Sequence, residues 1–298
     1  MNSNVLEKLI QIPGWQNSSS YKLLSGGITN QNYLITLNSK PYVLRVYGAH
    51  TLELGIARDR EIACHSIAAK LGLAPDIFFI LPDASGIVTP YIEGKILSEN
   101  ELRDPHILSL VAKTLRTFHS GPLFPGQFSP FRVVREYYDK ALVHKVLFPD
   151  NVREVIATLN DIEKSISSIV REGSCHNDLL GGNFIYDGEK IWMLDWEYAA
   201  SGDLFFDLGN FSINLGLSSE QTQTLLREYF GTLTNKDVAH LELMKLASDM
   251  REAFWGFLQS AISEIEFDYT AYALKYYNRF QDCVSQKNYQ EWMNNVCK

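Results

Sequence analysis

Residues 175–183 read CHNDLLGGN, and residues 193–197, a short way downstream, read MLDWE. The order is His-x-Asp, then Asn, then a second Asp at the end of the next apolar run, which is typical of a kinase catalytic loop and its metal-binding aspartate. Phosphoryl transfer needs one carboxylate to orient the attacking hydroxyl. It also needs an amide oxygen and a second carboxylate to hold Mg²⁺ on the nucleotide phosphates. Asp178, Asn183 and Asp195 are the candidates for these three tasks.

A motif that fixes so few positions also occurs by chance, and a polar turn between two strands is the alternative interpretation. Residues 185–186 and 191–194 are apolar runs typical of short strands, and Asp187 with Gly188 between them is a hairpin signal. A hairpin at this place returns Asp195 to the side of Asn183. The surroundings therefore favour the catalytic loop.

Composition limits the classes of function. The 298 residues suit two packed lobes or one large domain, and 46% of them are hydrophobic, as in globular proteins. The formal net charge of -8, without a Lys/Arg-rich tract, argues against a nucleic-acid groove or an anionic membrane surface as the partner. Small neutral or cationic substrates fit better.

The cysteines and the apolar runs indicate a cellular compartment. The four cysteines are widely spaced and form no Cys-x-x-Cys pair, so neither a disulfide framework nor a zinc site is predicted. No apolar run approaches the roughly 20 residues that span a bilayer. We therefore expect a cytoplasmic protein with reduced thiols.

The spacing of apolar residues changes part-way along the chain. From residue 21 to residue 90 the pattern favours strands at 21–24, 33–37 and 42–46, and it contains a single helix. That helix is expected at 56–71, where Gly72 and Pro75 end it. After residues 91–94 the spacing becomes helical. The expected helices include 107–118, 215–230, 238–262 and 267–284.

These patterns predict an α+β fold with two lobes. Residues 1–92 are expected to form a lobe around a small antiparallel β-sheet, which binds the nucleotide. Residues 93–298 are expected to form a mainly helical lobe, which holds the catalytic and substrate-binding residues. The active site then lies where the lobes meet, a usual location for a ligand cleft. The sequence carries no signal for the oligomeric state.

Residues 25–30, which read SGGITN, lie between the first two expected strands. Glycines at such a place let backbone N–H groups approach phosphate oxygens, so Gly26, Gly27, Thr29 and Asn30 are candidates for a phosphate loop. The alternative is an ordinary hairpin turn.

Two charged residues and a tyrosine complete the nucleotide candidates. Arg45 lies inside an apolar strand, and Glu61 lies early in the following helix, as a phosphate-contacting cation and its ion-pair partner would. Tyr91, at the junction of the two expected lobes, is the third candidate. The alternative for the two charges is a place on the surface.

With these residues identified, the chain resembles the choline/ethanolamine kinases and, more distantly, the aminoglycoside phosphotransferases and thiamine kinases. Residues 25–30 resemble the phosphate loop of the family, and 42–48 resemble its third strand, with Arg in place of the protein-kinase Lys. Residues 176–178 and 195–198 resemble its catalytic and metal segments, and 206–210 also match. The resemblance implies a two-lobed protein-kinase-like fold. It also implies ATP and Mg²⁺ as cofactors and phosphoryl transfer to a small amino alcohol.

The choice of alcohol rests on residues 254–257 and 265–269, which resemble the choline-pocket helices of the family. A quaternary ammonium has no N–H to donate, so aromatic faces and a nearby negative charge recognise it. The expected aromatic faces are Trp255, Tyr269 and Tyr198, and the expected negative charges are Asp207 or Glu197. The alternative is that the aromatic residues pack in a core and that Asp207 braces the catalytic loop.

Two positions depart from the pattern of many eukaryotic members. Leu258 stands where those members have a second Trp, and Asn214 stands where an acidic residue is expected. We therefore expect choline first, then ethanolamine or thiamine, and then an aminoglycoside. A nucleotide-binding pseudokinase scaffold is the non-enzymatic alternative. Such proteins usually lack the base or a metal ligand, and here Asp178, Asn183 and Asp195 are all present.

Overall fold

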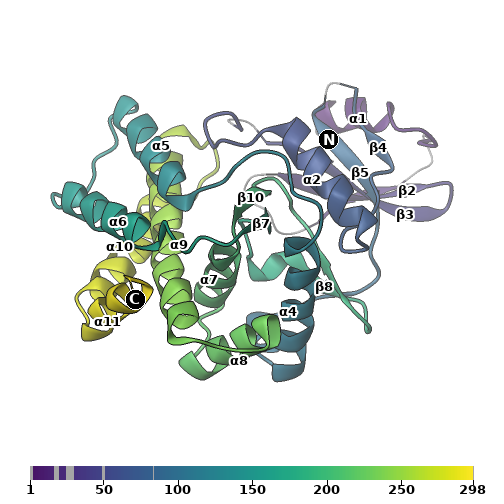
Figure 1. Ribbon diagram of the computed structural model, residues 1–298. Helices are drawn as coiled ribbons and strands as arrows, with labels where there is room; N and C mark the ends of the chain where they lie inside the picture. Colours follow the sequence, from purple (N-terminus) through teal and green to yellow (C-terminus); the bar gives the residue numbers. More distant parts are fainter. Residues whose placement is uncertain (1–2, 17–19, 25–29, 49–50, 83, 298) are drawn as a thin grey trace.

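The computed structural model describes residues 3–16, 20–24, 30–48, 51–82 and 84–297. Figure 1 shows a β-sheet at one end of the molecule and most of the helices at the other. The sheet has five antiparallel strands in the order β1-β2-β3-β5-β4. Their bounds are β1 (Tyr21–Leu23), β2 (Gln31–Leu37), β3 (Lys40–Val46), β4 (Phe79–Ile80) and β5 (Gly86–Pro90). The expected strands are confirmed, and the predicted phosphate-loop residues Gly26, Gly27 and Thr29 lie outside the described residues.

Alternation along β2 decides which face of the sheet is buried. Tyr33, Ile35 and Leu37 are buried, whereas the residues between them are partly exposed. This is the pattern of an antiparallel strand with one face against a core. The first helix, α1 (Ser3–Leu9), covers that face with Leu9, so the sheet has a small core of its own.

Helix α1 lies before residue 21, outside the stretch for which the sequence predicts a single helix. Helix α1 has 7 residues, which is too short to show a clear helical spacing of apolar residues. The second helix, α2 (Arg58–Lys70), matches the expected one, and Gly72 after it has φ +74°. Its buried residues Cys64 and Ala68 belong to the core of the helical part rather than to the small core. Helix α2 therefore connects the sheet to the rest of the molecule.

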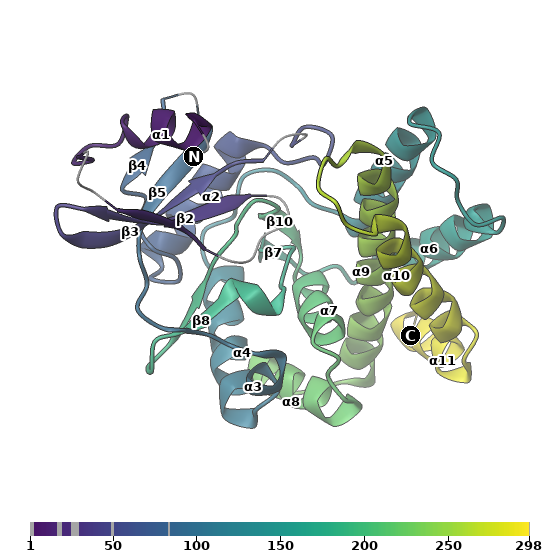
Figure 2. The same cartoon turned by 180° about the vertical axis from the view of Figure 1, so that it is seen from behind.

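The helical part is built around one long helix, α9 (Asn235–Ile262). The views from both sides show it in the middle of this part (Figures 1 and 2), in contact with α5, α7, α10 and α11. From Leu243 to Gln259 every residue of α9 is buried, because neighbours cover all of its sides. The other helices are α3 (Glu99–Leu102), α4 (Pro105–His119), α5 (Pro130–Val143), α6 (Val152–Ile166), α7 (Leu204–Asn214), α8 (Ser219–Phe230), α10 (Tyr269–Val284) and α11 (Lys287–Cys297). The four expected helices are confirmed.

Two small sheets interrupt the helices. Strands β7 (Glu172–Cys175) and β10 (Ala200–Asp203) form one antiparallel pair. The other sheet has the order β6-β8-β9, with β6 (Lys95–Ile96), β8 (Phe184–Tyr186) and β9 (Ile191–Met193). Strands β8 and β9 are the predicted hairpin, which is confirmed. Along the chain, β5 is the last strand of the large sheet, and the next strand, β6, pairs with β8 of the helical part. We therefore propose that the lobes divide between residues 92 and 93, as the sequence suggests.

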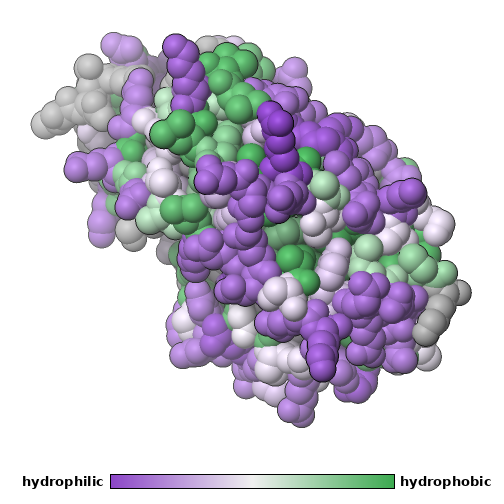
Figure 3. Space-filling model, turned by 90° about the vertical axis from the view of Figure 1, so that its left-hand side faces the viewer, coloured by the Kyte–Doolittle hydropathy of each residue, from purple (hydrophilic) through white to green (hydrophobic). Residues whose placement is uncertain are grey.

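The face of the molecule drawn in Figure 3 is mostly polar. Seen from the side of Figure 1 that carries the helices, hydrophilic residues cover most of the molecule, and apolar residues appear in scattered groups (Figure 3). Among the described helices none combines the length and the apolar character that crossing a membrane requires.

We expect Gly209→Ala to destabilise the protein. Gly209 lies in α7, and a Cβ there would stand 3.0 Å from the backbone nitrogen of Lys245 and from the carbonyl carbon of Met244 in α9. A helix backbone cannot yield as a side chain does, so the free energy of unfolding should fall by about 1–3 kcal/mol. Urea unfolding measures this. Gly182→Ala is the control, since a Cβ there would meet no described atom within 4 Å; an equal loss in both variants would contradict the expectation.

Candidate active site

A buried carboxylate holds the catalytic loop in place. Asp207, in the first turn of α7, accepts hydrogen bonds from the backbone N–H of His176 to Oδ2 and from that of Asn177 to Oδ1, both at 2.7 Å. Asn177 has φ +66°, a left-handed backbone conformation that is uncommon for residues other than glycine. The backbone N–H of Leu179 donates to Asn210 Oδ1 at 2.6 Å. Helix α7 thus fixes the backbone on both sides of Asp178.

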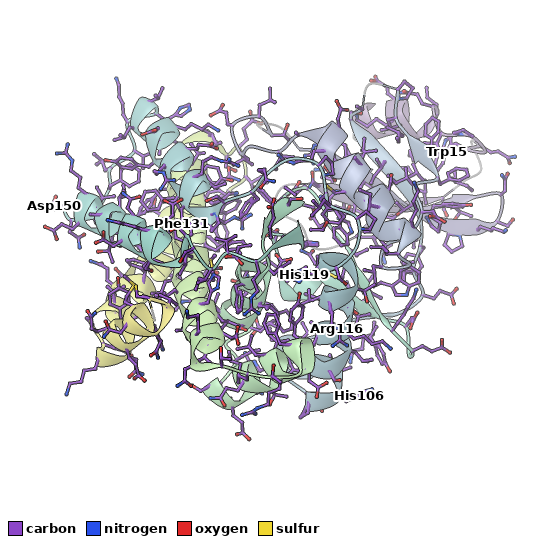
Figure 4. All side chains as sticks on the ribbon, viewed as in Figure 1. Trp15, His106, Arg116, His119, Phe131 and Asp150 are labelled. Atoms are coloured by element: carbon purple, nitrogen blue, oxygen red, sulfur yellow. The ribbon has the colours of Figure 1, made fainter. Side chains whose placement is uncertain are left out.

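Further contacts complete the support of the loop. His119, labelled in Figure 4, is the last residue of α4. Its Nε2 is 3.0 Å from Asp207 Oδ2, and its Nδ1 is 2.7 Å from the hydroxyl of Tyr229. Asp207 has no solvent exposure and does not line the cavity described below. This geometry favours the alternative that Asp207 braces the catalytic loop, because its two oxygens accept from the loop backbone and it lies away from the cavity.

The three motif residues lie around one cavity of about 670 Å³ between the sheet and the helices. Asn183 donates from Nδ2 to the carbonyl oxygen of Asp178 at 2.9 Å, and the backbone N–H of Leu194 donates to the carbonyl oxygen of Asn183 at 2.9 Å. These bonds bring the end of β9 beside the catalytic loop. Asp178, Asn183 and Asp195 all line the cavity.

The donor atoms at this place fit Mg²⁺. The Oδ1 atom of Asn183 has no hydrogen-bond partner among the described residues, and the Asp195 carboxylate is 25% exposed toward the cavity. Amide and carboxylate oxygens are the ligands that a hard cation prefers. Burial disfavours the charged form of Asp195, but the Arg45 guanidinium beside it holds the pKa of this carboxyl below its usual value. Asp195 is thus ionised, as a metal ligand must be.

A network of charges fills the sheet side of the cavity. Arg45 on β3 bonds Asp195, and its Nη2 lies 3.4 Å from Glu197 Oε2 while its Nε lies 3.6 Å from Glu61 Oε1. The predicted pair of Arg45 and Glu61 is therefore present in the geometry. Arg58 joins them: its Nη1 bonds Glu61 and lies 3.2 Å from Glu197 Oε2. Sequence reasoning missed Arg58, although its place three residues before Glu61 on the same helix was a usable signal.

Asn30 and Glu197 belong to the same network. Asn30 donates from Nδ2 to Glu197 Oε2 at 2.9 Å, and its Oδ1 accepts from the N–H of Gly48 at 3.2 Å. Burial and the neighbouring Asp195 charge raise the pKa of Glu197 to about 7. Glu197 thus lies among the nucleotide candidates and not at the far end of the cavity, where its predicted role with the substrate cation would place it. Tyr91 also lines the cavity.

Aromatic residues from α9 and α10 form the far wall of the cavity. Trp255 lines it, with its ring centroid 5.6 Å from that of Tyr272 and 5.8 Å from that of Tyr269. Tyr198 and Tyr272 line the cavity too, but Tyr269 does not, and its hydroxyl bonds Ser263 Oγ at 2.9 Å. Tyr272, about one helical turn further along α10, therefore occupies the place in the cavity wall that the sequence assigns to Tyr269. Leu258 and Asn214 do not line this cavity.

Two charged residues of α9 were missed by sequence reasoning. Arg251 Nη1 donates to Asp178 Oδ1 at 2.9 Å and to Glu252, and the Arg251 guanidinium lies 4.4 Å from the centroid of the Tyr198 ring. Glu252 Oε2 accepts from the hydroxyl of Tyr272 at 2.6 Å. Burial raises the pKa of Asp178 to about 7, with Arg251 opposing the rise and Glu252 adding to it. The only sequence signal was an adjacent pair of charges inside a largely apolar helical stretch.

A model of the choline/ethanolamine kinase family matches residues 21–281. The chain belongs to this family. It is 26% identical to probable choline kinase 3 of Arabidopsis thaliana, over 88% of this chain and 86% of the relative. It is 27% identical to a probable ethanolamine kinase of the same plant, over 88% of this chain and 79% of the relative.

Solved structures confirm the kinase-like fold. The structure of a choline/ethanolamine kinase family protein from Mesorhizobium loti has a TM-score of 0.86 at 24% identity, and covers 99% of this chain and 98% of that chain. A structure of LicA in complex with AMP has a TM-score of 0.74 at 24% identity, and covers 91% of this chain and 93% of that chain. Family and fold together support a small-molecule kinase, and relatives named for choline and for ethanolamine match equally well.

We expect Asp207→Ala to lower the free energy of unfolding by about 3–5 kcal/mol, because it leaves two buried backbone N–H groups and His119 without their acceptor. Urea unfolding measures this. Asp104→Ala is the matched control, since Asp104 also accepts from two backbone N–H groups but at an exposed helix start, where the loss is about 1 kcal/mol. Similar losses of unfolding free energy in both variants would show that the hydrogen bonds to Asp207 stabilise the protein no more than an exposed helix cap does.

Proposed function

We propose that this protein transfers the terminal phosphoryl group of ATP to the hydroxyl of a small amino alcohol, with Mg²⁺, and that choline is its acceptor. One observation carries the proposal. A single cavity has the phosphoryl-transfer residues Asp178, Asn183 and Asp195 on one side, and Trp255 and Tyr272 on the other. Nucleotide and acceptor therefore have room in the same cavity, with Asp178 between them.

The candidate site residues have separate tasks in phosphoryl transfer. Asp178 orients the acceptor hydroxyl and takes its proton. Asn183 and Asp195 would hold Mg²⁺, which neutralises charge on the phosphates when bound. Arg45, kept in place by Glu61, contacts the phosphates. Asn30 and Tyr91 contact the nucleotide, as do Gly26, Gly27 and Thr29 outside the described residues, and the AMP complex of the related LicA supports nucleotide use.

The hydrogen bonds of the far wall favour a cation without N–H groups. An ammonium group such as that of ethanolamine needs oxygen acceptors. Each oxygen of Glu252 already accepts one hydrogen bond, from Arg251 or from Tyr272, and Asp178 Oδ1 accepts from Arg251, so these carboxylates have fewer open acceptor sites for an ammonium than free carboxylates would. A trimethylammonium group needs only aromatic faces and a negative environment, each cation–π contact contributing about 0.5–2 kcal/mol. Trp255, Tyr272 and Tyr198 provide such faces.

A coupled assay of ADP release tests the proposal. It compares choline, ethanolamine, thiamine and an aminoglycoside as acceptors, with Asp178→Asn as the inactive control. Choline should give the highest kcat/KM. Ethanolamine or thiamine as the best acceptor would keep the kinase but change its substrate. Nucleotide binding without turnover on any acceptor would favour the pseudokinase alternative.

We expect Asp195→Ala to remove the Mg²⁺ dependence of ATP binding. Calorimetry with and without Mg²⁺ measures the affinity. Without Mg²⁺, the affinity should stay the same or rise, because Arg45 loses one of its three carboxylate neighbours, so less of its positive charge is compensated and more is available to the phosphates. Asp187→Ala, which removes an exposed carboxylate from the β8–β9 turn, should keep the Mg²⁺ dependence of the wild type. Unchanged Mg²⁺ dependence in Asp195→Ala would contradict its role as a ligand.

We expect Trp255→Ala to lower the preference for choline over its neutral isostere 3,3-dimethyl-1-butanol. A pocket that uses cation–π attraction should favour choline by roughly 1–2 kcal/mol, about 5–30-fold in kcat/KM, and lose this preference without Trp255. Phe257→Ala on the same helix is the packing control, because Phe257 is buried away from the cavity. It should lower stability and keep the preference. Equal losses for both alcohols in Trp255→Ala would contradict the cation site.

A further inference from the structure

Arg251 is a buried cation in contact with the proposed base. It lies on α9 with 2% of its surface exposed, and it lines the cavity. Two carboxylates hold the same nitrogen, Nη1: Asp178 through Oδ1 at 2.9 Å, and Glu252. The face of the guanidinium lies on the ring of Tyr198. The side chain is thus fixed on three sides.

Stability does not explain this arrangement. Arg251 Nε and Nη2 are buried and have no hydrogen-bond partner among the described residues. A buried cation with unsatisfied donors costs free energy, and a buried ion pair is weak evidence of stabilisation. Arg279 on α10 and Asp249 on α9 form an ion pair outside the cavity. In contrast to Arg251, Arg279 donates to both oxygens of its partner, from Nε and Nη2.

The contact determines which oxygen of Asp178 is available. Oδ1 accepts from Arg251, whereas Oδ2 has no hydrogen-bond partner among the described residues. A carboxylate held by one oxygen on a fixed guanidinium cannot rotate freely, so the second oxygen keeps one direction. Proton transfer needs that oxygen within hydrogen-bond reach of the acceptor hydroxyl.

Glu252 connects the contact between Arg251 and Asp178 to the far wall of the cavity. Its Oε1 holds Arg251, and its Oε2 accepts from Tyr272, whose ring lines the cavity beside Trp255. Asp178, Arg251, Glu252 and Tyr272 therefore form one hydrogen-bonded chain. It runs from the base to the place where the acceptor cation is proposed to bind.

We propose that Arg251 is a positioning residue: held by Glu252, it fixes Asp178 through Oδ1 and so directs Oδ2 to the acceptor hydroxyl. The inference rests on the proposed function, since it concerns the same site. It goes beyond that function because it places on α9, far from the catalytic motif in the sequence, a residue that turnover needs.

Steady-state kinetics of Arg251→Ala tests the proposal. The kcat should fall on the order of 10²-fold, because a base that is free to rotate loses much of its typical 10²–10⁴-fold contribution. ATP affinity should change less than twofold, because the guanidinium contacts no nucleotide candidate. Guanidinium chloride at millimolar concentration should restore part of kcat in this variant, whereas sodium chloride and methylammonium chloride should not. Arg251→Lys, which keeps the charge but lacks the planar guanidinium group, should recover less than half of the kcat lost in Arg251→Ala.

Arg279→Ala is the matched control, since it breaks an ion pair of the same helix outside the cavity. It should lower thermal stability and keep kcat within twofold of the wild type. If Arg251→Ala does not fold, the double variant Arg251→Gln with Glu252→Gln replaces both charges by neutral residues of similar shape. It should show the same fall in kcat with unchanged ATP affinity.

The outcomes separate this inference from the proposed function. A wild-type protein that phosphorylates no acceptor would overturn the proposed function and the inference together. An active wild type with a kcat within twofold in Arg251→Ala, or in the double variant, would overturn the inference alone. A fall in kcat that guanidinium does not restore, accompanied by an equal fall in Arg279→Ala, would assign both arginines to stability and also overturn it.

Discussion

The hydrogen bonds from the loop backbone to Asp207 are the constraint on which the site depends. Asp207 is inaccessible to solvent and takes both of its backbone partners from the catalytic loop. Without this acceptor, two buried N–H groups would be unsatisfied, and Asn177 would lose the support for its left-handed conformation. The direction of Asp178 follows from that of its neighbours. A residue outside the cavity thus fixes the backbone that carries Asp178.

The surroundings of Asp195 and Asp178 shift the pKa values of these two carboxyl groups in opposite directions. Asp195 lies against Arg45, which holds its pKa low, so it stays ionised. Burial raises the pKa of Asp178 to about 7, because Arg251 compensates only part of the cost of a buried charge. A carboxylate that stays ionised suits a metal ligand, and one with a pKa near neutrality suits an acid–base group. The two environments come from different elements, β3 and α9.

Helix α9 serves both the core and the cavity. Buried on all sides over most of its length, it holds α5, α7, α10 and α11 together. The same helix presents Arg251, Glu252 and Trp255 to the cavity. The far wall of the cavity is therefore attached to a helix that is buried over most of its length, and the positions of its side chains depend on the packing of the whole helical part. Rigid support of this kind favours precise orientation of an acceptor.

The sequence alone determined the motif residues, three strands of the large sheet, the β8–β9 hairpin, five of the described helices and the family resemblance, because these follow from local spacing and from contiguous motifs. Tertiary structure decided the rest. The contact of Arg251 with Asp178 joins residues 73 positions apart, and that of Arg45 with Asp195 joins residues 150 apart. Periodicity shows that Tyr269 and Tyr272 are helical, but only the packing of α10 on α9 places Tyr272 in the cavity and Tyr269 behind it. Which atoms meet across such distances depends on how whole elements pack, and no local pattern encodes that.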